Sequence, residues 1–155
     1  VKRVDDVLHI FAGVRQQIPA KLLLVGDGPD RPRIEKLCRD IGFCNDIRFL
    51  GKLEAVEEVL SIADLFLMPS EKESFGLAAL EAMACEVPVI STDAGGIPEL
   101  NVHGETGMVS HIGDVEDMVK NALFVLEEDN LPRFKAAARA RAETFAVDNI
   151  VPRYE

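Results

Sequence analysis

Two glutamates in the middle of the chain have a spacing that could bind the hydroxyls of a sugar. Seven residues separate Glu73 from Glu81, and a short apolar run precedes the pair. A helix that begins near Phe75 or Gly76 leaves Glu73 in the preceding loop. Glu81 then lies on the helix, one turn beyond Leu77. Because one carboxylate accepts two hydrogen bonds side by side, a glutamate placed in this way could hold two vicinal hydroxyls.

The same segment also offers donors for an anion. Leu77, Leu80 and Ala84 recur at helical spacing and form the expected buried stripe. Glu81 borders this stripe, where a carboxylate is costly unless hydrogen-bond donors meet it. Gly76 has no Cβ and lets a ligand approach the backbone, so the free amides at the helix start could bind a phosphate. Hydroxyl acceptors beside a phosphate site predict a nucleotide-sugar pocket.

The flanking segments predict one strand–helix–strand unit around the two glutamates. Residues 64–69 form a short apolar run that ends in a turn at Pro69, and residues 88–91 form a second apolar run. Both runs are typical of buried strands. Two such strands joined by a helix form a parallel unit.

Strands and helices alternate along the rest of the chain. Further strands are predicted at 21–26, 47–51 and 107–109, and helices at 4–17, 31–41, 56–63, 114–128 and 131–145. This alternation predicts an α/β fold with a Rossmann-like open parallel sheet and helices on both faces. Ligands of such sheets bind beyond the carboxyl ends of the strands, where the loops with the candidate residues lie.

These motifs resemble a known enzyme family. The segment 73–81 resembles the E-x7-E signature of retaining glycosyltransferases of the GT-B fold, in family 4, which includes sucrose and trehalose-type synthases. Further matching segments follow in the family's order at 20–29, 49–52, 81–85, 95–99 and 103–107. The resemblance covers nearly the whole chain, and it implies the C-terminal, donor-binding half of a GT-B fold.

The resemblance implies a role for each matching residue. Glu81 would hold the ribose diol of the donor, and Lys2 would approach its diphosphate. Glu73 would act on the sugar and phosphates, together with the backbone amides at the helix start. The predicted catalytic residues are Lys2 and Glu73, and the predicted donor-binding residues are Gly26, Lys52, Leu53, Glu73, Ser74, Phe75, Gly76, Leu77 and Glu81. Alternatively, Lys2 is a solvated lysine, Gly26 belongs to a purely structural turn, and Lys52 with Leu53 forms an ordinary loop.

The amino-acid sequences of two segments indicate a particular reaction within the family. Residues 1–4 and 70–77 are most similar to family members that transfer N-acetylglucosamine from UDP-N-acetylglucosamine to L-malate in bacillithiol biosynthesis. The resemblance implies a nucleotide sugar as donor substrate and no metal or other cofactor. The alternatives are another hexosyltransferase of family 4, with a different donor or acceptor, and a nucleotide-sugar-binding module without catalysis.

The ends of the sequence suggest part of a longer enzyme. The chain begins at Val1 and stops at Glu155, inside a segment that resembles the crossing to the other domain of the fold. We therefore expect residues 1–155 to be a single nucleotide-sugar-binding domain, with the N-terminal acceptor domain absent and the fragment alone inactive. The sequence does not exclude that the protein forms a homo-oligomer.

Composition excludes several other classes of function. The 155 residues are 48% hydrophobic and carry a formal net charge of −10, which argues against nucleic-acid binding. The apolar runs are too short to span a bilayer, and no leader opens the chain. Three cysteines, Cys38, Cys44 and Cys85, lack metal-binding spacing and cannot all pair with one another, so we expect reduced thiols in a cytoplasmic protein.

Other candidate chemistries are weaker. Asp93 and Glu99 could be metal ligands, but no compact Asp-x-Asp cluster accompanies them. His103 is typical of a turn histidine, and His9 and His111 have no partner nearby in the sequence. A nicotinamide site is disfavoured because Arg31 stands where the third glycine of G-x-G-x-x-G would follow Gly26 and Gly28.

One residue departs from the family pattern. Glu86 stands where the family has a glycine, just after the helix that carries Glu81. A glycine there would cap the helix easily. A glutamate must either avoid a positive φ or accept strain.

Overall fold

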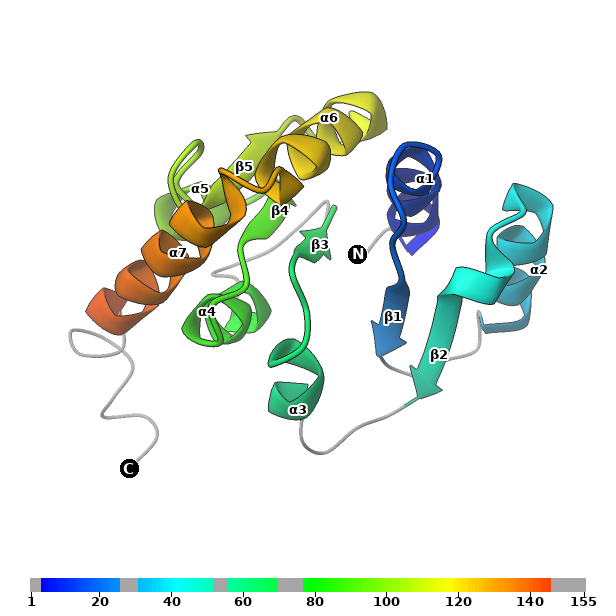
Figure 1. Ribbon diagram of the computed structural model, residues 1–155, viewed down its shortest axis with the longest axis horizontal. Coiled ribbons are helices and arrows are strands. Elements are labelled where there is room, and N and C mark those ends of the chain that lie inside the picture. The colour runs from blue at the N-terminus through cyan, green and yellow to red at the C-terminus, as the bar shows by residue number, and fades with distance from the viewer. Residues whose placement is uncertain (1–3, 26–30, 52–55, 70–76, 146–155) are drawn as a thin grey trace.

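The computed structural model describes residues 4–25, 31–51, 56–69 and 77–145 (Figure 1). The strands are β1 (Leu22–Val25), β2 (Ile47–Gly51), β3 (Phe66–Met68), β4 (Val89–Thr92) and β5 (Gly107–Ser110). The helices are α1 (Val4–Arg15), α2 (Arg31–Ile41), α3 (Val56–Leu60), α4 (Leu77–Ala84), α5 (Ile97–Leu100), α6 (Val115–Leu126) and α7 (Leu131–Phe145), and residues Cys44–Asp46 form a 3₁₀ turn, η1.

All strand pairs in the described residues are parallel, as predicted. One sheet consists of β1 and β2, and the other has the order β3-β4-β5. The central strand β4 is buried along its whole length, because it has a neighbour on each side and helices on both faces. Its residue Val89 pairs with Phe66 of β3 and with Gly107 of β5.

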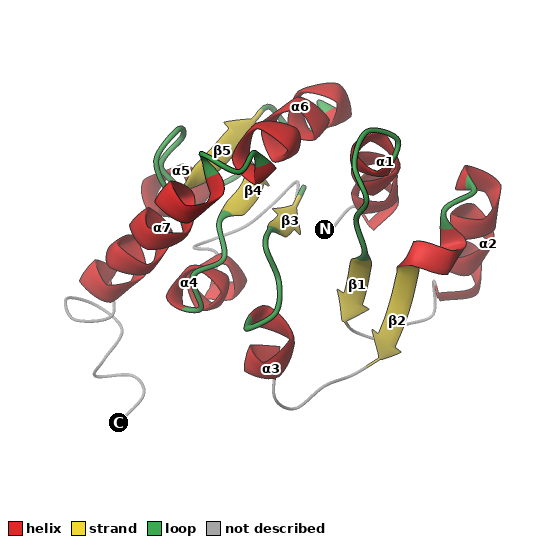
Figure 2. Cartoon of the chain, viewed as in Figure 1, coloured by secondary structure: helices red, strands yellow, loops and turns green. Residues whose placement is uncertain are grey.

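Helices cover both faces of the three-stranded sheet (Figure 2). Val89 packs in a cluster with buried residues of α4, α5 and α7, whereas its neighbour Ile90 packs in a cluster with residues of α1, α6 and α7. Neighbouring residues of a strand point to opposite faces, so β4 contributes to two cores. A third cluster joins α1, α2 and β2 through Leu8, Ile34 and Ile47. The predicted Rossmann-like α/β class is therefore confirmed.

Two local expectations are wrong. The strand at 21–26 was expected to be covered on both faces, but β1 is only half-buried and Val25 is 42% exposed. Within the described residues β1 has β2 as its one neighbouring strand, so no strand covers its other edge. The loop after β4 also contains a short helix, α5, which no periodic pattern indicates because it has only four residues.

Two of the three cysteines form a disulfide, contrary to the expected reduced thiols. Cys38 lies in the last turn of α2, and Cys44 begins η1. Gly42 lies between them with a φ of 97°, a conformation that favours glycine and reverses the chain. The reversal brings the two Cα atoms to 5.2 Å, within the range that a disulfide spans. Cys85 remains a free thiol, half-buried against the core.

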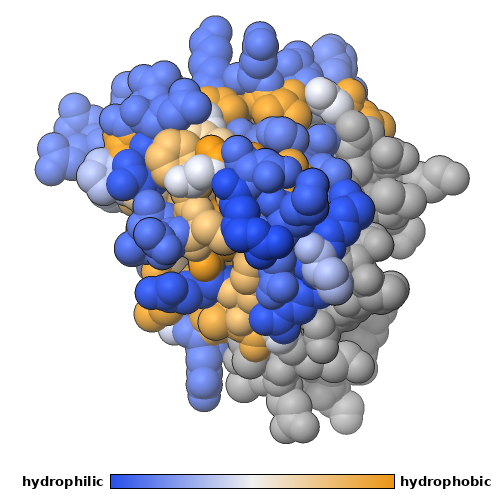
Figure 3. All heavy atoms as spheres, turned by 90° about the vertical axis from the view of Figure 1, so that its right-hand side faces the viewer, coloured by the Kyte–Doolittle hydropathy of each residue, from blue (hydrophilic) through white to orange (hydrophobic). Residues whose placement is uncertain are grey.

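The face of the molecule that carries α2 is mainly hydrophilic, with smaller hydrophobic patches between the hydrophilic side chains (Figure 3). Only Ile34 and Cys38 of α2 are buried. Within the described segments, no helix combines the length and the apolar composition that crossing a bilayer requires.

Candidate functional site

The carboxyl ends of the parallel strands lie along one edge of the sheet. The register pairs Met68 of β3 with Ser91 of β4, and Thr92 of β4 with Ser110 of β5, so the three strands end at nearly the same level. Open α/β sheets bind their ligands beyond this edge. The segments that follow β3, β4 and β5 are therefore the first candidates for a site.

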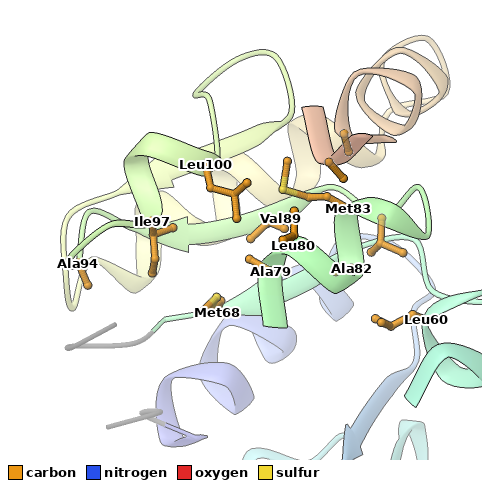
Figure 4. Close-up of a cluster of buried hydrophobic side chains, with 13 residues drawn as sticks. Leu60, Met68, Ala79, Leu80, Ala82, Met83, Val89, Ala94, Ile97 and Leu100 are labelled. Carbon is orange, nitrogen blue, oxygen red and sulfur yellow. The ribbon is translucent and has the colours of Figure 1, made fainter. Parts of the chain in front are cut away.

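Helix α4 carries Glu81, a residue of the candidate site, and the side chain of Glu81 is exposed to solvent. Its buried residues face the sheet and α7, and they include Ala79, Leu80, Ala82 and Met83 (Figure 4). Glu81 and Ala84 are both exposed. Ala84 was expected in the buried stripe, and Glu81 at its border, and both expectations are wrong.

The exposure of Glu81 matters for its chemistry. Glu81 and Ala84 are three residues apart and lie on the exposed face of α4. The carboxylate of Glu81 is hydrated rather than buried, so it is free to exchange water for hydroxyls of a ligand without first breaking a buried contact.

Most of the predicted site residues lie outside the described residues. These are Lys2, Gly26, Lys52, Leu53, Glu73, Ser74, Phe75 and Gly76. The chain itself still restricts them: Gly26 directly follows β1, Lys52 directly follows β2, and Gly76 directly precedes α4. Since β1 and β2 are parallel, Gly26 and Lys52 come after strand ends that share one edge. The roles of these residues stay predictions.

The loop after β4 is held from the core side. Ala94 is 3% exposed and Ile97 is fully buried, and both side chains point into the cluster around α4 (Figure 4). The amide of Ile97 donates to the carbonyl of Ala94 and starts α5. Gly95 has a φ of 48°, a left-handed conformation that glycine adopts without strain. The loop is therefore a defined structure in which Gly96 is the N-cap of α5.

The structure brings together Asp93 and His111, which the sequence left apart. Asp93 directly follows β4, His111 directly follows β5, and His111 Nδ1 lies 2.9 Å from Asp93 Oδ2. This hydrogen bond and the attraction between the charges raise the pKa of the His111 imidazole and lower the pKa of the Asp93 carboxyl. The expectation that His111 is isolated is wrong. Only the pairing of β4 with β5 could have indicated this contact, because 18 residues separate the two in sequence.

Asn101 is a second residue that the sequence analysis missed. It is buried at the end of α5, and its amide Nδ2 donates to the carbonyl of Val89 at 3.0 Å and to Ser91 Oγ at 2.9 Å. Its Oδ1 accepts from Thr106 Oγ1 at 2.9 Å. Asn101 therefore joins β4 to the turn before β5. Gly107 allows this approach, since a Cβ there would lie 2.7 Å from Asn101 Oδ1.

His103 has the structural role that was predicted. Its Nδ1 accepts a hydrogen bond from the amide of Val109 in β5 at 2.9 Å. A ring nitrogen engaged in this way holds the turn against the strand. The residue lies near the amino end of β5, away from the edge that carries Asp93 and His111.

A groove of about 860 Å³ follows α6 and the outer side of β5. Residues of α6 and β5 line most of it, among them Lys120, Phe124 and Val109, together with Gln17 and His103. Glu81 is not among the described residues that line it. Within the described residues, no three histidine, cysteine or acidic side chains come together as a metal site would require.

A parallel α/β sheet with connecting loops at its carboxyl edge is an architecture that often binds nucleotides. Residues 1–142 match the family described as "Glycosyl transferases group 1". The chain belongs to this family of retaining GT-B glycosyltransferases, as its motifs predicted.

Individual relatives are similar over most of the chain. N-acetyl-alpha-D-glucosaminyl L-malate synthase of Bacillus anthracis is 46% identical over 158 aligned residues, which cover 100% of this chain and 41% of the relative. The chain thus spans about two fifths of that relative's length.

Solved structures share the fold. S. aureus TarM, in a complex that includes UDP, has a TM-score of 0.89 at 23% identity and matches 99% of this chain and 32% of its own. Anabaena HepE in complex with UDP has a TM-score of 0.84 at 25% identity, over 92% of this chain and 41% of its own. This chain therefore has the fold of the corresponding part of both enzymes.

Proposed function

We propose that the chain is the donor-binding domain of an enzyme that transfers N-acetylglucosamine from UDP-N-acetylglucosamine to L-malate, the step that serves bacillithiol biosynthesis. The observation that carries this proposal is the 46% identity to N-acetyl-alpha-D-glucosaminyl L-malate synthase, which extends over the whole chain. The open carboxyl edge of the parallel sheet, with the exposed Glu81 on the helix that follows β3, supports it.

The donor is a UDP sugar in this proposal. HepE, which has the same fold at 25% identity, is known in complex with UDP. A diphosphate is an anion and this chain carries a formal charge of −10, so binding needs local donors rather than overall attraction. The amides at the start of α4 would supply them, because the first amides of a helix have no partner within the helix.

Each site residue has a defined task in the transfer. Glu81 accepts hydrogen bonds from the ribose hydroxyls, and Glu73 with the amides at the start of α4 holds the sugar and phosphates. Lys2 stabilises the negative charge that grows on the departing diphosphate, an electrostatic contribution to catalysis. These tasks do not require Glu73 to be a covalent nucleophile.

The acceptor site belongs to another part of the protein. This chain covers 41% of its relative, and a GT-B enzyme binds donor and acceptor on different domains. We expect the isolated 155-residue chain to bind the donor without transferring the sugar. We also propose that the complete enzyme works in the cytoplasm, although a disulfide such as Cys38–Cys44 is rare in cytosolic proteins.

The test is an assay of the complete gene product with UDP-N-acetylglucosamine and L-malate. We expect release of UDP together with a malate glycoside of retained α configuration. Transfer from another nucleotide sugar, or to another acceptor, would replace the proposed reaction with that of a different family 4 enzyme. Donor binding without transfer to any acceptor would favour a binding module without catalysis.

A further inference from the structure

The Asp93–His111 pair connects two loops at the ligand edge of the sheet. The amide of Asp93 donates to the carbonyl of Ser110 at 2.9 Å, which extends the pairing of β4 and β5 by one residue. The side chains then meet, with His111 Nδ1 2.9 Å from Asp93 Oδ2. One backbone and one side-chain contact therefore join the start of the loop after β4 to the start of the loop after β5.

Two kinds of contact hold the loop at 93–96. Buried side chains pack against the core, and the hydrogen bond between Asp93 and His111 lies at the surface. On the core side, Ala94 and Ile97 are buried and cannot shift without opening the core. On the outer side the side chain of Asp93 is 42% exposed and that of His111 is 89% exposed. The outer contact is thus the one that solution conditions are able to change.

Carboxylates surround His111. Asp93 contacts it from the end of β4, and the charges of Asp114 and Asp117, at the start of α6, also act on it. Asp114 is the N-cap of α6 and accepts from the amide of Asp117, so the acidic side chains beside His111 have fixed positions. The hydrogen bond to Asp93 is the main cause that raises the pKa of His111, and the charges of Asp93, Asp114 and Asp117 add to it.

The charge of His111 changes the strength of the outer contact. Below its raised pKa the ring is an imidazolium paired with a carboxylate. Above that pKa the ring is neutral, and only a weaker hydrogen bond to Asp93 remains. Within the described residues, the ion pair that Asp93 forms is with His111.

We propose that His111 and Asp93 position the loop at 93–96 for binding of the UDP sugar, and that protonation of His111 tightens this binding. The inference rests on the proposed donor function. The loop follows β4, whose carboxyl end lies beside that of β3 at the edge where we place the donor site. Both residues act through the loop and are positioning residues.

The test measures the affinity of the complete gene product for UDP-N-acetylglucosamine from about pH 5.5 to about pH 8.5, without acceptor. This ligand is suitable because both of its phosphates are esterified, so its charge is constant over the range, whereas free UDP takes up a proton near pH 6. We expect the dissociation constant to rise about two- to fivefold as the pH increases through the pKa of His111, the size expected for an exposed ion pair.

Variants separate positioning from a general effect of pH. His111→Gln should bind at the weaker, high-pH level throughout, and Asp93→Asn should also lose the pH step. His111→Lys keeps a positive charge at every pH tested, so it should bind at the tighter level without a step. His9→Gln is the matched control, because His9 is an exposed histidine on α1. It should retain the full pH step.

A second readout follows the histidine itself. Linkage requires that a ligand favoured by protonation lowers the acid dissociation constant of His111 by the same factor and so raises its pKa. NMR titration of the imidazole signals, with and without UDP-N-acetylglucosamine, should show this rise in the wild type and not in Asp93→Asn. An unchanged pKa on binding, or a pH step that survives in His111→Gln, would overturn the positioning role and leave the donor function standing. Failure of the wild type to bind at any pH would overturn both.

Discussion

Glu86 ends α4 in a conformation that favours glycine. Its φ is 65°, and its amide donates to the carbonyl of Met83 at 3.0 Å while the amide of Val87 donates to that of Ala82 at 2.9 Å. These two bonds form the Schellman motif, which has a left-handed residue at this position. Of the two outcomes that the sequence left open, the glutamate accepts strain, and its exposed contact with Arg139 at 3.6 Å offsets little of it.

Replacing this residue with glycine should stabilise the protein. A left-handed conformation costs a residue with a Cβ about 1–2 kcal/mol, and the greater freedom of glycine in the unfolded chain cancels part of the gain. We expect Glu86→Gly to raise the free energy of unfolding by about 1 kcal/mol and the Tm by about 2–4 °C. Glu86→Ala is the control, since it removes the carboxylate and keeps the Cβ. Urea and thermal unfolding measure both variants. An equal increase in the free energy of unfolding in both would show that the left-handed conformation of Glu86 is not strained.

Asp46 should make the stability depend on acid pH. Its carboxylate accepts from Arg15 Nε at 2.8 Å and from Lys21 Nζ at 2.7 Å, and these hydrogen bonds, that to Lys21 first, lower the pKa of Asp46. A carboxyl with a lowered folded-state pKa stabilises the fold above its unfolded pKa of about 3.9. This stabilisation is lost as the pH falls through the folded value.

Urea unfolding at neutral pH and at successively lower pH measures this effect. Asp46→Asn should be less stable than the wild type at neutral pH, and the difference should shrink as the pH falls below about 4. Asp40→Asn, at an exposed aspartate of α2, is the control and should change stability little. A difference between Asp46→Asn and the wild type that is the same at every pH would contradict the argument.

For single residues, the sequence predicted the kind of element that holds a residue better than it predicted which residues make contact. It placed Glu81 on a helix and His103 in a turn correctly. It chose the wrong face for α4, because Leu77–Ala84 is apolar nearly all round and its period does not select a side. It missed the Asp93–His111 contact, because that contact depends on how β4 and β5 align.

Among the elements, the junction of α2 with η1 is fixed by the Cys38–Cys44 disulfide. The bond closes a loop with a sequence separation of six, and for so short a loop the entropy removed from the unfolded chain corresponds to about 2 kcal/mol. We expect reduction to lower the free energy of unfolding by about this amount. Urea unfolding with and without dithiothreitol measures the difference.

A matched pair of variants separates the disulfide from other thiol effects. Cys38→Ala with Cys44→Ala should be insensitive to reductant, whereas Cys85→Ser should respond as the wild type does, because Cys85 is a free thiol. Equal stability of the wild type with and without reductant would show that the bond does not form in solution. The original expectation of reduced thiols would then hold.

Periodic elements were the most predictable part of the fold. The bounds predicted for α2 and α7 agree with the structure, because apolar residues recur in both at helical spacing. The strands were found from short apolar runs between turn residues. Helix α5 was missed because four residues carry no period, although Pro98, the second helical residue after the N-cap Gly96, was a usable signal.

At the scale of the whole molecule, the order of strands and helices predicted a parallel sheet, and that order places the loops after the strands along one edge. The family resemblance then added the chemistry of that edge. What the sequence could not provide are contacts between elements, such as those of Asn101 with Val89 and Ser91, because these follow from packing rather than from local pattern.

The central claim is that a uridine nucleotide binds at the carboxyl edge, with Glu81 on its ribose. Calorimetric titration of UDP, ADP and GDP into the complete gene product tests it most directly, with Glu81→Ala and, as a control, Glu128→Ala, which removes an exposed carboxylate beyond the end of α6. We expect UDP to bind most tightly. Losing hydrogen bonds to a charged group worth about 2 kcal/mol should weaken UDP about 30-fold in Glu81→Ala and leave Glu128→Ala unchanged. Equal UDP affinity in the wild type and Glu81→Ala would contradict the proposed site.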